Sequence, residues 1–550
     1  MKAFTEPLLS LAGFEEMTKT AEKSSGLISV TGCIDAQKSQ MIYAFGGHRK
    51  NKLIVTFGEQ KAKELYDEYS FFDKEVVYYP SKDVLFYQSD IRGNLLTAER
   101  IRALKAIREK ERVTLVTTFD ALMNTMAPIE KMWENVLTLE QGQLLDLKEI
   151  QAALIRMGYE KEYQVQTMGQ FSVRGGILDV FPLTEENPIR IELWGDEIDT
   201  IRYFDCESQK SIENTDRVSI YPAAELVLSD EEKAGGIEKL KAEAKRVSDK
   251  LRKQMKTEEA HRVTVMADEL TEEWGELSMY AGMDAFLSYF FDERVGLLDY
   301  FNPSDSLIFF DELTRCTEQG KLTETEFSES MKQRLAMGYI LPGQMNGLFT
   351  EKEIVAKLGK YSCIALAALD NKANGLHQLG SYGIHCQSVS PYNNSFELLI
   401  KDLKRYKKNG YRVILLSGSR TRAKRLSEDI TDQGITCFYT ENYDHELSQG
   451  QIMVCYGKVR RGFEYPILKF AVITESDIFG AQQKKKKRHR TYEGEKIQSF
   501  TDLSVGDYVV HENHGLGIYR GIEKLEVDKK VKDYIKIEYQ GCLLYTSDAA

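Results

Sequence analysis

Short apolar runs alternate with charged, helix-like stretches through the first part of the chain. The runs LISV (27–30), LIVTF (53–57), VVYYP (76–80) and TLVTT (114–118) are typical of buried strands, with helical stretches between them. This alternation favours a parallel α/β sheet. The same signal returns at SLIFFDEL (306–313), so we expect one α/β unit in two parts, 1–127 and 223–345.

Between these two parts the pattern changes to strand, turn, strand. Residues 164–204 contain FSV, an Arg-Gly-Gly turn, ILDVF, IRIELW and EIDTIRYF, which predict an antiparallel β-meander within an inserted module, 128–222. Residues 230–258 are charged and periodic, and they predict a single long exposed helix.

The second half of the chain divides by composition. Helical and strand patterns over 346–478 predict a small α/β domain, whereas the basic run within 479–498 is too like-charged to pack and predicts a linker. Residues 499–541 are rich in strand-forming patterns and predict a partial β-barrel. The expected fold class is therefore α/β multidomain with two β-rich parts.

Composition narrows the possible functions. At 550 residues the chain exceeds a single core. Its 73 Lys+Arg against 85 Asp+Glu leave a net charge of −12, which argues against coating nucleic acid by bulk charge. No apolar run of 18 residues occurs, and the N-terminus has acidic residues where a secretory signal needs apolar ones, so we expect a monomeric cytoplasmic protein without membrane contact.

Cysteine and histidine spacing predicts no metal site. The eight cysteines include no Cys-x-x-Cys pair. His511 and His514 lie close in sequence but have no third ligand nearby.

One string resembles a phosphate-binding loop but departs from it at a critical position. The P-loop needs G-x-x-x-x-G-K-[ST], because its second glycine lets backbone amides surround the phosphates. Residues 32–39 read GCIDAQKS, with Gly32, Lys38 and Ser39 in place but Gln37 where glycine is required. The pair Asp311-Glu312, at the end of an apolar run, resembles a Mg²⁺-holding element. We expect a relic of an ATPase fold with no ATPase activity, and no catalytic residue or cofactor in this chain.

The β-meander carries the most specific motif. Residues 169–205, GQFSVRGGILDVFPLTEENPIRIELWGDEIDTIRYFD, resemble the module by which UvrB, the damage-loading protein of bacterial excision repair, binds UvrA. The resemblance implies that this segment is a UvrA-binding surface. The alternative is a purely structural role, in which Arg174 is a solvated turn residue and Phe171 and Phe181 fill the core of the module. The candidate residues are Phe171, Arg174, Gly175, Gly176 and Phe181.

A second resemblance lies near the C-terminus. Residues 499–539 are similar to the RNA polymerase-interacting domain that transcription-repair coupling factors share with CarD-type regulators. The resemblance implies contact with the RNA polymerase β subunit through Ile535, Lys536 and Ile537. We expect these residues to form an edge strand that pairs with a strand of the partner, and an internal barrel strand is the alternative.

The order of modules resembles the N-terminal portion of the transcription-repair coupling factor (Mfd) family. The resemblance implies transcription-coupled nucleotide excision repair, in which stalled RNA polymerase is bound and UvrA is recruited. In that family, more barrel strands and an ATP-driven translocase motor for duplex DNA follow. We expect both to be missing here, with ATP and Mg needed only by that motor, and we expect residues 542–550 to be a non-native tail.

Two other functions remain possible on the sequence. One is a UvrB-like ATP-dependent DNA helicase in which the loop with Gln37 still works. The other is a CarD-like transcription regulator with an unrelated α/β body. The basic linker is either solvated or contacts the DNA backbone. Its candidate DNA contacts are Lys484, Lys485, Lys486, Lys487 and Arg488.

Overall fold

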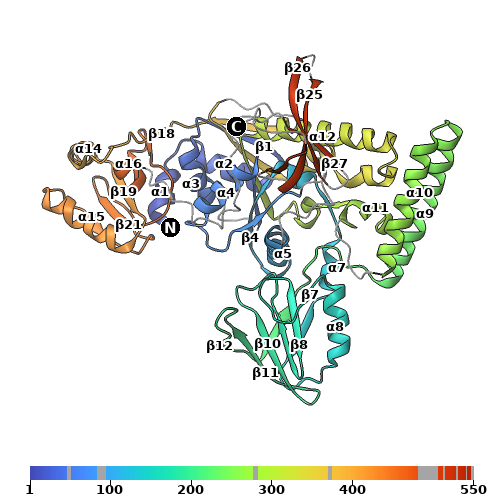
Figure 1. Ribbon diagram of the computed structural model, residues 1–550. Coiled ribbons are helices and arrows are strands. Elements are labelled where there is room, and N and C mark those ends of the chain that lie inside the picture. Colours follow the sequence, from blue (N-terminus) through green and yellow to red (C-terminus); the bar gives the residue numbers. More distant parts are fainter. Residues whose placement is uncertain are drawn as a thin grey trace. The chain divides into compact units, whose positions relative to one another are not determined.

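The computed structural model confirms an α/β multidomain fold (Figure 1). It describes residues 1–45, 51–82, 94–276, 283–369, 375–480, 506–511, 515–527, 530–539 and 542–546. The chain divides into two compact units, the first comprising Met1–Tyr87 with Asn94–Gln482 and the second Gln88–Gly93 with Gln483–Ala550. Each unit is described by itself.

A seven-stranded parallel sheet forms the first α/β domain, with strand order β17-β1-β16-β15-β2-β4-β3. Because β16 and β17 belong to this sheet, the domain continues to Gly383, beyond the expected boundary at residue 345. The strands are β1 (Gly26–Thr31), β2 (Asn51–Thr56), β3 (Val77–Tyr79), β4 (Val113–Thr118), β15 (Ser306–Asp311), β16 (Ser362–Leu366) and β17 (Gln378–Gly383).

Alternate residues of these strands enter two hydrophobic cores, one on each face of the sheet. Leu53 and Val55 of β2 join one core, and Ile54 between them joins the other. The first core is covered by α5 (Asn94–Glu109), α6 (Phe119–Met123), α7 (Ile129–Trp133), α12 (Leu313–Ala336) and α13 (Glu351–Leu358). The second is covered by α1 (Lys2–Leu9), α2 (Phe14–Lys23), α3 (Asp35–Phe45) and α4 (Glu59–Tyr69).

The inserted module contains a six-stranded sheet, in the order β12-β11-β10-β9-β8-β7, and a separate pair, β6 with β13. Its core includes Phe171, Leu178 and Ile191 of the sheet and Leu154 of a helix. The predicted β-meander is confirmed. The elements are β6 (Leu137–Glu140), α8 (Leu147–Arg156), β7 (Glu160–Lys161), β8 (Gln170–Arg174), β9 (Ile177–Val180), β10 (Ile189–Trp194), β11 (Glu197–Phe204), β12 (Ser211–Asn214) and β13 (Arg217–Ile220).

A helical hairpin follows the module. The single helix expected over 230–258 is wrong, because α9 (Asp230–Lys253) ends before Met255, whose φ of +62° reverses the chain into α10 (Thr257–Glu276). Trp274 of α10 is fully buried in a separate hydrophobic core, which also contains residues of α9 and of the segment after α10. The remaining short elements here are η1 (Met283–Phe286), α11 (Leu287–Phe290), β14 (Val295–Gly296), which pairs with β5 (Thr125–Met126), η2 (Leu297–Tyr300) and η3 (Pro342–Gly347).

The small α/β domain has a six-stranded mixed sheet, in the order β18-β22-β23-β19-β21-β20. One face has its own core, whereas the other, which includes Ile414, Leu416 and Phe470, packs into the second core of the first domain. Its elements are β18 (Gln387–Ser388), α14 (Phe396–Lys408), β19 (Arg412–Ser417), α15 (Arg420–Asp432), β20 (Phe438–Tyr439), β21 (Ile452–Tyr456), β22 (Phe463–Tyr465), β23 (Phe470–Thr474) and α16 (Glu475–Phe479).

The second unit contains an antiparallel four-stranded sheet in the order β24-β25-β26-β27. The strands are β24 (Tyr508–His511), β25 (Gly515–Val527), β26 (Lys530–Tyr539) and β27 (Cys542–Thr546). Strand β27 lies within the segment that we expected to be a tail, and it pairs with β26 from Cys542 to Thr546.

A buried ion network fastens the end of the inserted module to the first domain. The guanidinium of Arg100, on α5, donates to both carboxylate oxygens of Glu225 at 2.7 and 3.0 Å, and Lys82 lies 3.0 Å from the same carboxylate. Burial alone raises the pKa of Glu225, but the charges of Arg100 and Lys82 lower it from 4.5 to about 2. The carboxylate is therefore held in its charged form by the fold.

We predict that Arg100→Met destabilises the protein by about 3–5 kcal/mol, because it leaves the carboxylate of Glu225 buried without its main partner. The parent's Glu225 contribution should be complete above pH 4.5 and fall as the pH drops toward about 2. Thermal unfolding followed by circular dichroism measures both effects. The control is Arg217→Ala, which removes an exposed pair with Glu140 and should change little.

Candidate functional site

The loop that resembles a P-loop lies between β1 and α3, at the carboxyl edge of the first sheet. The amides of Gly32 and Cys33 donate to the carbonyls of Ala368 and Ala367 at 3.3 and 2.9 Å. A Cβ on Gly32 would lie 2.0 Å from the carbonyl oxygen of Ile384. These two loop amides are therefore bonded within the protein, and the glycine at this position permits close packing of the segment that follows β17.

Lys38 lies inside a cluster of carboxylates. Its Nζ is 2.5 Å from Asp311 Oδ1, 2.9 Å from Glu312 Oε1 and 3.2 Å from Asp35 Oδ1. Its side chain is 1 % exposed, as is that of Asp311. Burial alone lowers the pKa of Lys38, but the charges of Asp311 and Glu312 more than offset this and raise it above the usual value. The ammonium is thus neutralised by the carboxylates expected to hold Mg²⁺.

The small α/β domain contacts the same helix through buried polar groups. The hydroxyl of Tyr465, on β22, lies 3.1 Å from Gln37 Oε1 and 3.3 Å from Gln40 Oε1, and all three side chains are buried. Gln40 Nε2 donates to the carbonyl of Phe4 at 2.5 Å. Gln37 Nε2 and Ser39 Oγ are buried without a hydrogen-bond partner. Gln37, where a P-loop requires glycine, therefore joins the two α/β domains.

The inserted module presents a charged sheet face. Asp179 on β9 is 1 % exposed, and Arg190 on β10 donates to its two carboxylate oxygens at 2.7 and 2.8 Å. Arg174, at the end of β8, donates to the same carboxylate at 2.8 Å and is 36 % exposed. The predicted turn arginine is therefore partly exposed, but it is paired within the module. Gly175 has a φ of +61°, and it completes the turn with Gly176.

Trp194 extends this face and was missed from the sequence. It is 85 % exposed at the end of β10. Arg190, which was also missed from the sequence, lies four residues earlier on the same face of this strand. The alternation in IRIELW was the available signal, because Ile189 and Ile191 are buried and the residues between them point to the other face. We define the outer face as Arg174, Asp179, Arg190, Glu192 and Trp194.

The two phenylalanines proposed for the UvrA-facing surface are buried instead of exposed. Phe171 is fully buried in the module's core, and Phe181 is 8 % exposed. Neither offers a surface to a partner. Phe171 is buried because it shares the apolar phase of the sheet with its partner Val180 on β9. Phe181 follows β9 directly and is buried outside that core cluster.

Ile535, Lys536 and Ile537 lie in β26, which pairs with β25 on one side and β27 on the other. The expected edge strand is therefore an internal strand, and the sheet edges are β24 and β27. A partner strand cannot pair with β26 unless β27 leaves. The basic-linker candidates, Lys484–Arg488, lie outside the described residues, as does His514.

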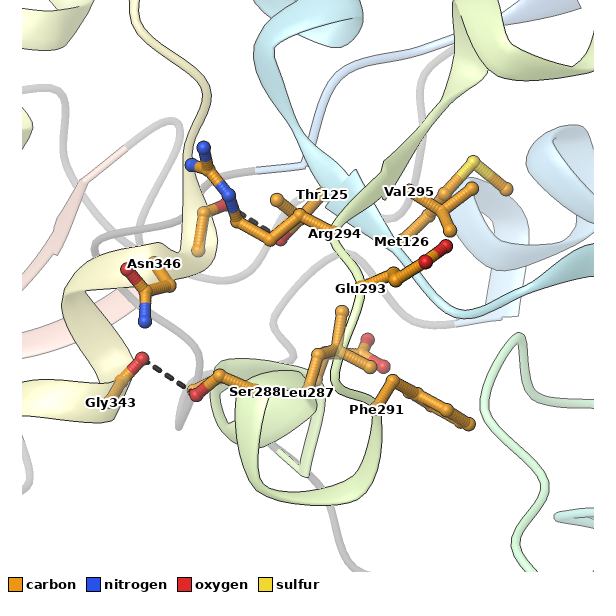
Figure 2. A pocket seen from close by; sticks show the side chains of 13 residues that line it. Thr125, Met126, Leu287, Ser288, Phe291, Glu293, Arg294, Val295, Gly343 and Asn346 are labelled. Carbon is orange, nitrogen blue, oxygen red and sulfur yellow. Dashed lines mark hydrogen bonds between the residues drawn. The ribbon is translucent and has the colours of Figure 1, made fainter.

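A pocket lies beside the helical hairpin rather than at any predicted site residue (Figure 2). Ser288 donates to the carbonyl of Gly343 at 2.8 Å across it, and Thr125 donates to that of Gly347 at 2.9 Å. These bonds tie η3 to its neighbours. In the ranges that the structure covers, no group of three His, Cys, Asp or Glu side chains has metal-site geometry. No helix within those ranges is long and apolar enough to cross a membrane.

Two family models match the two β-rich parts of the chain. The UvrB interaction domain matches residues 137–226, which include the whole outer face. The CarD-like/TRCF RID domain matches residues 503–546, and it thus extends past the expected end at 541 to include β27. These matches bear out both resemblances noted in the sequence.

Comparison with curated proteins extends the likeness across the α/β domains. The transcription-repair-coupling factor of Bacillus subtilis strain 168 is 30 % identical over 491 residues, which cover 89 % of this chain and 41 % of that protein. This chain is similar to the transcription-repair-coupling factors over most of its length. Those of Staphylococcus haemolyticus and Staphylococcus aureus strain USA300 are 29 % and 28 % identical, over 94 % and 96 % of this chain and 44 % of each relative. The chain thus spans about two fifths of the length of these relatives.

We predict that Lys38 is a structural cation. Lys38→Met should lower the stability by about 3–5 kcal/mol, because Asp311 and Glu312 lose their buried counter-charge. The triple variant Lys38→Met, Asp311→Asn, Glu312→Gln should recover part of this stability, since it removes both sides of the cluster. Thermal unfolding of the three proteins is the measurement. A Lys38→Met variant as stable as the parent would contradict this role.

Proposed function

We propose that this chain couples transcription to excision repair by binding UvrA through its inserted module and RNA polymerase through its second unit. The observation that carries the proposal is the presence of both interaction domains in one chain, at residues 137–226 and 503–546. The two α/β domains serve as the scaffold of the first unit. A shared core and the buried contact between Tyr465 and Gln37 support this role.

The outer face of the module is the proposed UvrA-binding surface. Trp and Arg are the residue types that most often dominate binding energy at protein interfaces, and here Trp194 is exposed beside two arginines. Asp179 holds both guanidiniums in place, and Arg174 is 36 % exposed against 13 % for Arg190, so a partner carboxylate can meet Arg174 with little loss of side-chain entropy. This arrangement favours an acidic, partly apolar partner surface.

The second unit is proposed to contact the RNA polymerase β subunit. Because β26 is internal, we assign this contact to the side chain of Lys536 or to backbone pairing at β27, the neighbouring edge. Lys536 is partly exposed on β26, and it is the residue chosen to test the side-chain route.

We assign no ATP hydrolysis to the loop at Gly32–Ser39. Phosphates would have to displace both bonded amides and the carboxylates around Lys38, and the charge of Lys38 is already compensated. These contacts weigh against the UvrB-like helicase alternative. We propose ATP-driven translocation on duplex DNA only for a protein as long as the transcription-repair-coupling factors to which this chain is similar. A CarD-like regulator alone would not account for the match at residues 137–226.

We predict that the two binding functions separate by mutation. Trp194→Ala with Arg174→Ala should reduce capture of purified UvrA by at least about tenfold, because a hot-spot residue contributes about 2 kcal/mol or more. The same variant should retain RNA polymerase. Pull-downs with purified partners give the measurement, and Ile155→Ala with Arg156→Ala, on the exposed side of α8, is the matched control.

The converse variant tests the second unit. Lys536→Glu should weaken capture of RNA polymerase and leave UvrA capture at the parental level, because the altered charge lies on a separate unit. If neither partner is captured by the parent chain, the proposed function is wrong. DNA-stimulated ATP hydrolysis by the parent, abolished in Lys38→Ala, would favour the helicase alternative instead.

A further inference from the structure

The tip of the α9–α10 hairpin concentrates positive charge in an acidic protein. Residues 239–256 contain eight Lys or Arg and two acidic residues, Glu243 and Asp249, so their net charge is 8 − 2 = +6 in a chain of −12. Glu258 and Glu259, at the start of α10, reduce the local sum to 8 − 4 = +4. The opposite end of the hairpin is acidic, from Asp230 to Glu232 on α9. The charge of α9 is therefore strongly polarised along its length.

Most of these cations are not used by the fold. Lys239 pairs with Asp292, and Arg246 pairs with Glu243. Among the described residues, no ion pair engages the other six, all of which are exposed: Lys241, Lys245, Lys250, Arg252, Lys253 and Lys256. Cations in the last turn of a helix interact favourably with its dipole, and this accounts for Lys250, Arg252 and Lys253. It does not explain the cations two turns earlier.

The cations converge on one side of α9. Lys245, Arg246, Lys250 and Lys253 border one shallow depression, together with Asp249 and Ala242. Neighbouring like charges on a helix cost about 0.2–0.5 kcal/mol for each pair at a spacing of four, as at Lys241 and Lys245.

A second basic surface among the described residues differs in this respect. At the start of α15, Arg420 pairs with Glu441 and Arg422 with Glu475, and in the loop after β21 Arg460 pairs with Glu64. The charges of those guanidiniums are thus compensated within the protein. The hairpin tip is instead available to a partner with many negative charges.

We propose that the tip of the α9–α10 hairpin binds the phosphate backbone of duplex DNA. Cations over 241–253 extend along about 18 Å of helix at 1.5 Å per residue, and duplex DNA presents one charge every 3.4 Å along each strand over such a length. Contacts to phosphates carry no sequence information, so this binding is expected to be independent of sequence. The choice of DNA over an acidic protein rests on the proposed function, which brings the chain to a transcribed template.

The test is DNA binding by the full chain with Lys245→Glu, Lys250→Glu and Lys253→Glu. Fluorescence anisotropy with a labelled 30-base-pair duplex, measured over a range of salt concentrations, should show affinity reduced at least tenfold. The slope of log affinity against log salt is negative, and it should become shallower by about 0.9 for each phosphate that the variant no longer neutralises. The control, Lys401→Glu, Lys404→Glu and Lys408→Glu on α14, has the same net charge and should bind as the parent does.

Three outcomes would overturn the proposal. They are parental affinity in the hairpin variant, an equal reduction in the α14 control, and displacement of the DNA by polyglutamate at equal charge concentration. The last would indicate an acidic polypeptide as the partner. A parental unfolding temperature excludes misfolding of the variant. The UvrA pull-down with the same variant should be unchanged, so failure of DNA binding at the hairpin is distinguishable from failure of the proposed function.

Discussion

The buried ammonium of Lys38 is the constraint on which the first unit depends. A charge removed from water must be compensated nearby, and here Asp311 and Glu312 supply the compensation from the end of β15. In a nucleotide-binding loop the same lysine would bind a phosphate. Because the counter-charge is internal and permanent, the carboxyl edge of the sheet is closed and its polar groups stabilise the protein.

This closure is continued by the small α/β domain. Tyr465 meets Gln37 and Gln40 in a buried contact, and apolar residues of both domains share one core around it. Two domains joined in this way are suited to hold other parts of the chain at fixed positions. A motor that opens and closes around a nucleotide needs the reverse, a cleft between domains that is free to change.

Charge compensation also separates structural from partner-facing surfaces elsewhere. Arg100 is buried and donates four hydrogen bonds, and it fastens the module to the first domain. Arg174 is only partly covered, so its guanidinium is positioned by Asp179 while one side stays in water. At the tip of α9, six of the cations have no counter-charge among the described ion pairs. Charge compensation is thus greatest for the buried Arg100 and least at the two surfaces proposed to bind partners.

The sequence by itself determined the fold class, the β-meander and the two resemblances, because strand alternation and motif residues are local properties of the chain. It also showed that Gln37 disrupts the phosphate loop. Only the tertiary structure showed that Asp311 occupies the place beside Lys38 that a phosphate has in a nucleotide-binding loop. Lys38 and Asp311 are far apart in the chain and meet where parallel strands end. Likewise, Phe171 and Arg174 are three residues apart on one strand, yet only sheet pairing decided which was buried. Strand order placed Ile535–Ile537 inside a sheet, because whether a strand lies at an edge depends on which segments pair with it, and alternation within the strand does not contain that information.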